Sequence, residues 1–456
     1  MTVQSRASSP GSPAPDAATL APALNAPAGD RAPDTTTTTP STRWRSPRLL
    51  GRNRDYTLMW SGQMISAVGS QVSLLALPIL IFALTRSPAA TGIASALRGI
   101  PYVLLMLPAG ALVDRWDRRR VMLISDTGRA LALGSIPVAA LLGHLSVAQI
   151  YVVTLIEGTL HVFFTLAETA SLPRIVSPAQ LPAATAQNEF LNSASVLAGP
   201  PLEGLLFSIG SAVPFLGDAI SYTASVASVF LIRTPLRSER AGERISVRQI
   251  LGDVREGMVW LWRAPVIRFL AVLTSGLMLT TFGYSLVVIV RATQEHASNV
   301  TIGLIFGAGG VGAVIGAMLA APLQRRFGFS RVMIGATWGW ALTWLLFAAG
   351  NTPLLLGMAN ALSYVVVPIY MATQFGYRLQ SIPDALQARV NSVFRLIAFG
   401  VQPISLALTG LLLQVLHPVA TVWLLFVPQV VLAVAATLSR SLRGAVAPQA
   451  ATRHNA

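Results

Sequence analysis

A short charged turn between two long apolar stretches constrains this chain more than any other feature of its sequence. The turn covers Gly110–Arg120 and contains two aspartates and four arginines. An apolar stretch at 89–113 precedes it, and another at 121–142 follows it. Charged side chains are costly in lipid, and apolar stretches of this length are driven out of water. The turn therefore predicts a membrane surface, with a membrane-crossing segment on each side.

The composition supports a membrane protein and excludes several other classes. Of the 456 residues, 53% are hydrophobic and only 11% are charged, against roughly 25% charged residues in soluble domains. The net charge of +15 would suit a nucleic-acid partner, but the arginines stand in the loops beside the apolar stretches, so we expect no such partner. The chain has no cysteine, which excludes disulfides and thiolate metal sites. We expect no metal and no cofactor.

Twelve stretches have the length and apolar character that a bilayer-crossing helix needs, roughly 20 residues. Six precede a polar interval and six follow it. They lie at 56–84, 89–113, 120–142, 147–170, 185–208, 212–232, 266–290, 300–323, 331–350, 353–376, 389–415 and 418–438. The sequence therefore predicts an all-α integral membrane protein with twelve transmembrane helices in two pseudo-symmetric six-helix bundles.

The domain boundaries follow from the same pattern. We expect a disordered N-terminal tail at 1–50, because residues up to about 45 are rich in Ala, Pro, Ser and Thr and have little apolar surface to bury. The bundles occupy 51–233 and 265–440, and a second tail covers 441–456. Between the bundles, 234–264 is a connector in which apolar residues recur at helical spacing, and it predicts an amphipathic helix on the membrane surface.

The arginines predict how the chain is oriented. With both ends on one side of the membrane, that side carries 25 arginines, and the other carries only Arg86 and Arg291. Loops that stay in the cytoplasm are enriched in arginine and lysine. We therefore expect a multi-pass plasma-membrane protein with both termini in the cytoplasm.

The two halves also resemble each other, and the chain resembles a known family. Arg120-Val-Met recurs as Arg331-Val-Met, each at the start of a third span. The pattern Gly110-x-Leu-x-Asp114-Arg115-x-x-Arg118-Arg119 resembles the signature turn of the major facilitator superfamily, although Asp117 stands where the general pattern has glycine. Further stretches resemble the drug- and siderophore-export branch, which includes enterobactin-type and macrolide-type exporters: 172–182, 199–204, 218–222, 255–265 and 383–395.

This resemblance implies a role for the charged turn. In the superfamily, its aspartate holds the cytoplasmic gate shut against the start of the eleventh span, which here begins near Arg389. A carboxylate at a helix N-terminus gains about 0.3–1 kcal/mol, and a glycine allows close helix approach. The gate residues are then Gly110, Asp114, Arg115, Arg118 and Arg119. A simpler interpretation stays open for the arginines, namely a positively charged membrane anchor.

Charged residues inside the predicted spans are candidates for function, because each costs ~2.5–3.5 kcal/mol at the membrane centre. Glu157 and His161 lie one helical turn apart, and a buried carboxyl is easily protonated, so this pair is a candidate for proton coupling. A structural hydrogen bond between the two, or an ion pair between Glu157 and Arg98, is the alternative. Asp126 and Arg129 share a helical face and predict an ion pair.

Five further residues have open assignments. Gln63 and Gln71 are candidates for the substrate cavity, as is Glu203, for which a harmless position near the extracellular end is the alternative. Arg395 is expected to pair with Asp114 or to approach an anionic substrate. Asp218 is expected to cap the start of the sixth span.

We find no zinc-binding, P-loop or nucleophile-elbow motif, so the sequence predicts no enzyme and no nucleotide-driven pump. The expected function is secondary active transport, most simply proton-coupled efflux of a bulky amphipathic drug, antibiotic or siderophore by a monomer that alternates its access. Its partners are then a small-molecule substrate, a coupling proton and the lipid bilayer. An importer of a small metabolite is the alternative on the same fold, and a non-transporting receptor or polytopic enzyme is the alternative from another class.

Overall fold

The computed structural model describes residues 53–237 and 247–445, and the predicted N-terminal tail lies outside these ranges. The first half contains six long helices, joined by turns and one 3₁₀ segment, η1 (Pro178–Gln180). The six are α1 (Arg54–Thr85), α2 (Pro88–Val113), α3 (Arg118–Leu141), α4 (Val147–Ile175), α5 (Leu181–Ile209) and α6 (Val213–Leu231). Several begin at residues that accept hydrogen bonds from the first helical turn, as Asn53, Ser87 and Ser146 do for α1, α2 and α4.

Within the connector, α7 spans Val247–Arg263, and the second half follows it. The helices of that half are α8 (Pro265–Thr281), α9 (Tyr284–Gln294), α10 (Asn299–Ala349), α11 (Pro353–Ser381), α12 (Asp384–Phe399), α13 (Gln402–Val415), α14 (Pro418–Leu438) and α15 (Arg440–Arg443). Each of the twelve predicted spans coincides with one of these helices, with part of one, or with two in succession. The all-α fold class is therefore confirmed.

Within the described ranges, ten helical stretches are long and apolar enough to cross a membrane. One of them, α10, has 51 residues and contains two predicted spans. At about 1.5 Å per residue it is far longer than the hydrocarbon core of a bilayer. Its helical course is interrupted at Gly328, where φ is +75°, a value that other residues rarely adopt. The helix α5 is long enough to cross but is not among the ten.

Two spans that the sequence predicts as continuous are each divided into two helices. The seventh consists of α8 and α9, which meet at Phe282–Gly283, and the eleventh consists of α12 and α13, which meet at Gly400–Val401. The two divided spans contact each other there, because the Gly283 N–H donates to Ser405 Oγ at 3.2 Å. A side chain at Gly283 would collide with Thr409. Close packing between the divided spans is the physical reason for glycine at this position.

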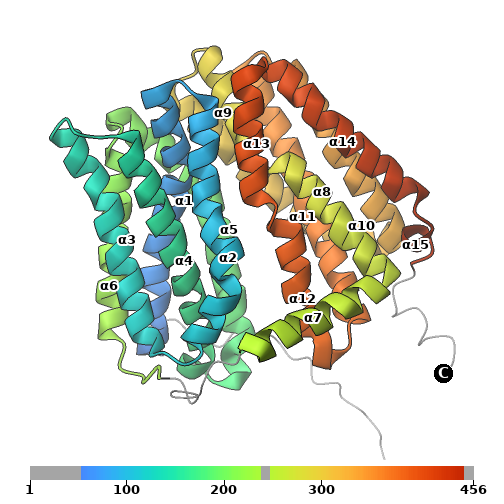
Figure 1. Ribbon diagram of the computed structural model, residues 1–456, viewed down its shortest axis with the longest axis horizontal. Coiled ribbons are helices and arrows are strands. Elements are labelled where there is room, and N and C mark those ends of the chain that lie inside the picture. Colours follow the sequence, from blue (N-terminus) through green and yellow to red (C-terminus); the bar gives the residue numbers. More distant parts are fainter. Residues whose placement is uncertain (1–52, 238–246, 446–456) are drawn as a thin grey trace, which may run out of the picture. The chain divides into compact units, whose positions relative to one another are not determined.

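The helices α1 to α6 pack together, and the second-half helices form a second group (Figure 1). The halves contact each other chiefly through α2 against α13 and α5 against α10. Both contacts depend on glycine: a Cβ added to Gly92 would lie 2.6 Å from the Leu406 carbonyl oxygen, and one added to Gly204 would lie 2.6 Å from the Asn299 carbonyl oxygen. These positions are near the ends of the helices opposite the charged turn.

Figure 1 shows α7 lying across the helix ends at the opposite pole, against α12. Leu261 is fully buried there, whereas Trp262 is half exposed. Arg389 of α12 forms ion pairs with Asp253 at 2.9 Å and with Glu256 at 2.5 Å. The helix α7 is therefore attached to the N-terminal part of α12 by packing and by charge.

Candidate functional site

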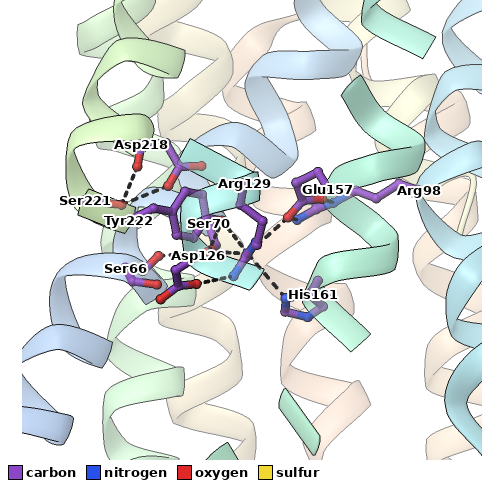
Figure 2. Close-up of polar contacts among 10 residues, drawn as sticks. All are labelled: Ser66, Ser70, Arg98, Asp126, Arg129, Glu157, His161, Asp218, Ser221 and Tyr222. Atoms are coloured by element: carbon purple, nitrogen blue, oxygen red, sulfur yellow. Dashed lines mark hydrogen bonds and ion pairs between the residues drawn. The ribbon is translucent and has the colours of Figure 1, made fainter. Parts of the chain in front are cut away.

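Five charged residues from four helices meet inside the first bundle (Figure 2). They are Arg98 of α2, Asp126 and Arg129 of α3, Glu157 of α4 and Asp218 of α6. Four of the five are 1% exposed or less, and Arg98 is half-buried. Burial of so many charges is costly unless they compensate each other. Their pairing therefore shows which of these groups can stay charged in the bundle.

Glu157 is the centre of this network. Its Oε2 accepts from Arg98 Nε at 2.6 Å, and its Oε1 accepts from Arg98 Nη2 at 3.2 Å. The same Oε1 also accepts from Arg129 Nη2 at 3.1 Å. Glu157 therefore lies between two guanidinium groups. The ion pair with Arg98, which the sequence left as an alternative, is present.

Arg129 connects Glu157 to the rest of the site. Its Nη1 lies 3.4 Å from Asp126 Oδ1, so the ion pair predicted within α3 is present. Its guanidinium also stacks 4.0 Å from the centre of the Tyr222 ring and donates to the Tyr222 hydroxyl. That hydroxyl shares a hydrogen bond of 2.8 Å with Ser70 Oγ of α1. One arginine thus joins α1, α3, α4 and α6.

His161 takes part at the edge of the network. Its Nδ1 lies 3.4 Å from Arg129 Nη2, the nitrogen that also donates to Glu157. Arg129 therefore contacts both residues of the predicted Glu157–His161 pair. The His161 side chain is exposed, unlike that of Glu157.

Asp218 lies inside α6, and the sequence-based expectation that it caps the start of this helix is wrong. The helix begins five residues earlier, at Val213, with Ala212 at the cap position. Asp218 Oδ1 accepts from Ser221 Oγ at 3.0 Å, and Gly69 of α1 leaves room for both side chains. For Asp218 the sequence offered, besides the capping expectation, only the resemblance of the stretch Asp218–Tyr222 to export proteins, which does not reveal a role.

The charged turn caps two helices. Asp114 is the C-cap residue of α2, and its backbone N–H donates to the Gly110 carbonyl at 3.0 Å. Asp117, the departure from the family pattern, is the N-cap of α3 and accepts from the Arg119 N–H at 3.1 Å. Arg115 donates to the Ala111 carbonyl at 2.7 Å. The turn is therefore well ordered by local hydrogen bonds.

The close helix approach expected at Gly110 is not made in this structure. A Cβ added there would meet nothing within 4 Å. Arg119 donates to the Phe230 carbonyl and lies over the Phe230 ring, within the first bundle, while the Arg118 Nε has no hydrogen-bond partner. Arg389, at the start of α12, is paired with α7.

The remaining candidates, namely Arg395 and the three residues proposed for the substrate cavity, lie as follows. Arg395 of α12 was expected to approach Asp114 or a substrate, and its Nη2 instead lies 3.3 Å from the Tyr102 hydroxyl of α2. Glu203 was a candidate for the substrate cavity, but its side chain has 0% exposure and therefore does not line an accessible cavity in this structure. Gln63 is also buried, at 8% exposure, and Gln71 is half-buried beside Gly199 of α5.

No group of three or more His, Asp or Glu side chains is placed to hold a metal ion within residues 53–237 and 247–445. What the site offers instead is a set of ionisable groups in an apolar bundle. Such a set can bind a proton, bind a charged substrate, or hold helices together by ion pairing.

Comparison with known proteins gives a family that matches almost the whole chain. A family described as transmembrane secretion effector matches residues 50–451. The multidrug efflux pump Tap of Mycolicibacterium fortuitum is 26% identical over 394 residues, which cover 83% of this chain and 94% of Tap. The enterobactin exporter EntS of Citrobacter koseri is 24% identical, over 82% of this chain and 88% of EntS.

Solved structures share the fold. The nucleoside transporter NupG has a TM-score of 0.66 at 16% identity, over 86% of this chain and 99% of NupG. A bacterial homologue of the iron transporter ferroportin, in an inward-facing state, has a TM-score of 0.67 at 17% identity, over 84% of this chain and 98% of that one. The same homologue in an outward-facing state has a TM-score of 0.53 at 19% identity, with the same coverage.

Proposed function

This chain belongs to the transmembrane secretion effector family of the major facilitator superfamily, and on that premise we propose that it is a proton-coupled exporter of bulky, amphipathic small molecules. As a member it is a membrane transporter of small-molecule substrates and not an enzyme. Export is supported by two relatives of nearly full length, which are named as a multidrug efflux pump and an enterobactin exporter. The sequence has no nucleotide-binding motif, so an ion gradient is the energy source of this proposal.

The observation that carries proton coupling is the buried ionisable network of the first bundle. Arg98, Asp126, Arg129, Glu157 and Asp218 lie together where each isolated charge would be unstable. Such a group couples transport to a proton gradient when it binds a proton in one conformation of the cycle and releases it in another. Because Glu157 holds two ion pairs, its contacts favour the structural interpretation of this residue over the proton-carrying one.

We propose further that this conformation is the inward-facing one. The halves pack closely at the helix ends opposite the charged turn, through Gly92 and Gly204. The ferroportin homologue gives the higher TM-score in its inward-facing state, 0.67 against 0.53. The arginine distribution supports cytoplasmic termini, and the charged turn then lies on the cytoplasmic side of the plasma membrane.

Reconstituted vesicles loaded with ethidium, a fluorescent lipophilic cation, test the proposal. An imposed proton gradient should drive dye movement against its concentration gradient, and a protonophore should abolish it. Gradient-independent dye movement would overturn proton coupling. Dye movement only in the same direction as the protons, as in symport, would overturn export and favour an importer.

A substitution in the charged turn tests the gate. Asp114→Asn should reduce transport by about tenfold, because a neutral amide loses the charge that stabilises contact with a helix N-terminus in the closed state. Glu295→Gln, an exposed acid at the end of α9 and away from the start of α12, is the control and should leave transport unchanged. Equal transport by both variants would overturn the gate assignment.

A further inference from the structure

The buried network of the first bundle has one carboxyl group more than its arginines can neutralise. Its two cations are Arg98 and Arg129, and its three acids are Asp126, Glu157 and Asp218. An unbalanced charge inside a membrane bundle is unfavourable, because its surroundings solvate it poorly. One of the three acids is therefore expected to be neutral in this conformation.

The contacts show which acids the arginines neutralise. Arg98 pairs with Glu157, Glu157 with Arg129, and Arg129 with Asp126, so the charges alternate along one chain. The two positive and two negative charges cancel within this series of ion pairs. Asp218 is the acid left outside it.

The surroundings of Asp218 suit a neutral carboxyl group. Its side chain is 1% exposed, Oδ1 accepts from the Ser221 hydroxyl, and Oδ2 has no hydrogen-bond partner. From α1 it meets Gly69 and the Ser73 hydroxyl, neither of which carries charge. A buried carboxylate whose only neighbouring donors are uncharged serine hydroxyls would be poorly compensated, whereas a carboxylic acid needs much less.

The charged and titratable groups around Asp218 come from the neighbouring helices. From α3 and α4, Arg129 and Glu157 act on it with opposite signs, and on its own helix Tyr222 lies between it and Arg129 (Figure 2). The helix α5, which also packs on α6, carries Glu189, which is exposed, and Glu203, which is buried without a hydrogen-bond partner. Arg129 is thus the cation available to Asp218, and it is already shared by Asp126 and Glu157.

We propose that Asp218 is the proton-binding residue of this transporter, neutral in the present conformation and ionised in another stage of the cycle. The assignment rests on the proton-coupled function proposed above. In the releasing step, the Asp218 O–H bond breaks, water takes the proton as hydronium, and a carboxylate remains. That carboxylate competes with Glu157 and Asp126 for Arg129, so proton release loosens the contacts that join α3, α4 and α6. Proton binding restores them.

Infrared spectroscopy of the reconstituted protein tests this assignment without any substrate. The difference between acid and alkaline buffers should contain the C=O stretching band of a protonated carboxyl group. We expect Asp218→Asn to lose one component of this band, and the matched control Glu203→Gln, a buried acid outside the ion-paired network, to keep that component. Glu168 of α4 is present in both variants, so subtraction from wild type removes its contribution. An unchanged band in Asp218→Asn, or loss of the same component in Glu203→Gln, would overturn the assignment.

Dye transport gives a second, separable result. In Asp218→Asn, proton-driven ethidium movement should fall by about tenfold or more, while dye exchange without a gradient should stay within about twofold of wild type. If Asp218→Asn does not fold, Asp218→Glu should fold and should shift the carboxyl band in frequency, and an unshifted band would count against Asp218. If wild type moves no dye, the dye part of the proposed function fails while the infrared result still decides the proton site.

Discussion

At the scale of single residues, Glu157 and Asp218 show how neighbours decide the role of a buried acid. Both are carboxyl groups in the same bundle, and both are almost fully buried. Glu157 accepts hydrogen bonds from two arginines, whereas the side-chain oxygens of Asp218 accept one from a serine. The first arrangement stabilises a permanent charge, and the second does not. These contacts favour a structural role for Glu157.

This assignment predicts a large effect on stability at Glu157. Glu157→Gln should destabilise the protein by about 3–5 kcal/mol, because Arg98 and Arg129 would both lose their shared counter-charge in a buried site. Thermal unfolding of the purified protein in detergent measures this. Glu168→Gln, on the same helix but outside the ion-paired chain, is the control and should change stability by less than about 1 kcal/mol.

A larger loss of stability in Glu168→Gln than in Glu157→Gln would contradict the structural role of Glu157. Asp218→Asn supplies a further comparison, because an amide has nearly the shape of a neutral carboxylic acid. It should unfold at nearly the wild-type temperature while losing proton-driven transport. A variant at Glu157 that stays stable and loses only proton coupling would restore Glu157 as the proton carrier.

At the scale of helices, α7 is attached to α12 by two different means. One is ionic, since Arg389 pairs with Asp253 and Glu256 at partly exposed positions. The other is steric, since a Cβ added to Gly257 would lie 2.8 Å from the Arg389 carbonyl oxygen. Exposed ion pairs contribute about 0–1 kcal/mol, and a backbone contact cannot give way easily. We therefore expect the packing to hold the helix more firmly than the charges.

Gly257→Val should consequently displace α7 and raise the hydrogen-exchange rate of its backbone amides between 251 and 263. Gly252→Val places the same side chain on the same helix, where an added Cβ would meet nothing within 4 Å, and should leave exchange unchanged. Arg389→Ala should raise exchange only slightly. If Arg389→Ala strongly raised the exchange rate of α7 and Gly257→Val did not, the ion pairs and not the packing would be the stronger attachment.

The helices themselves were largely predictable from the sequence, and their contacts were not. Apolar length locates a span, and polar residues such as Asn53 and Ser146 mark where helices begin. Helical spacing also predicted the ion pair of Asp126 with Arg129, three residues apart. The breaks at Gly283 and Gly400 were missed, because they reflect packing between spans that are distant in sequence.

The candidate site was predictable only in part, for the same reason. Periodicity shows which residues share a face of one helix but not which face of another helix lies opposite. Arg98 and Glu157 are 59 positions apart, and Arg129 and Tyr222 are 93 apart. The first pair was among the alternatives because unlike charges in a membrane tend to find each other. Tyr222, Ser70 and Asp218 carried no such signal.

At the scale of the whole transporter, the two halves meet through glycines at the helix ends opposite the charged turn. On one side of the contact Gly92 of α2 approaches Gly410 of α13, and on the other Gly204 of α5 approaches Gly303 of α10. Small residues let helix backbones approach closely. If access alternates, these contacts must open in each cycle, while the contacts within a half persist.

Cross-linking tests this, and the absence of native cysteines makes the chain suitable for it. Ser87, the N-cap of α2, donates to Gln414 of α13 at 2.8 Å. Cysteines at these two positions should therefore react with a short bis-methanethiosulfonate reagent, which joins both thiols through disulfide bonds, releases methanesulfinate and is cleaved by a reductant. Cross-linking should reduce ethidium transport by about tenfold, and cleavage of the reagent should restore it. Each single cysteine should have no such effect.

The matched control lies within the first half, near the same end of the helices. Gln149 of α4 donates to Ser135 Oγ of α3 at 3.1 Å, so a cysteine pair at these positions spans a similar distance but joins helices that move together. Its cross-linking should leave transport unchanged. Normal transport by the cross-linked 87/414 pair would mean that the halves do not separate at this end, and the glycine contacts would then be a fixed hinge. Loss of transport in both pairs would mean that the first half is itself deformed in each cycle, and the ion-paired chain through Arg129 would be the element that has to yield.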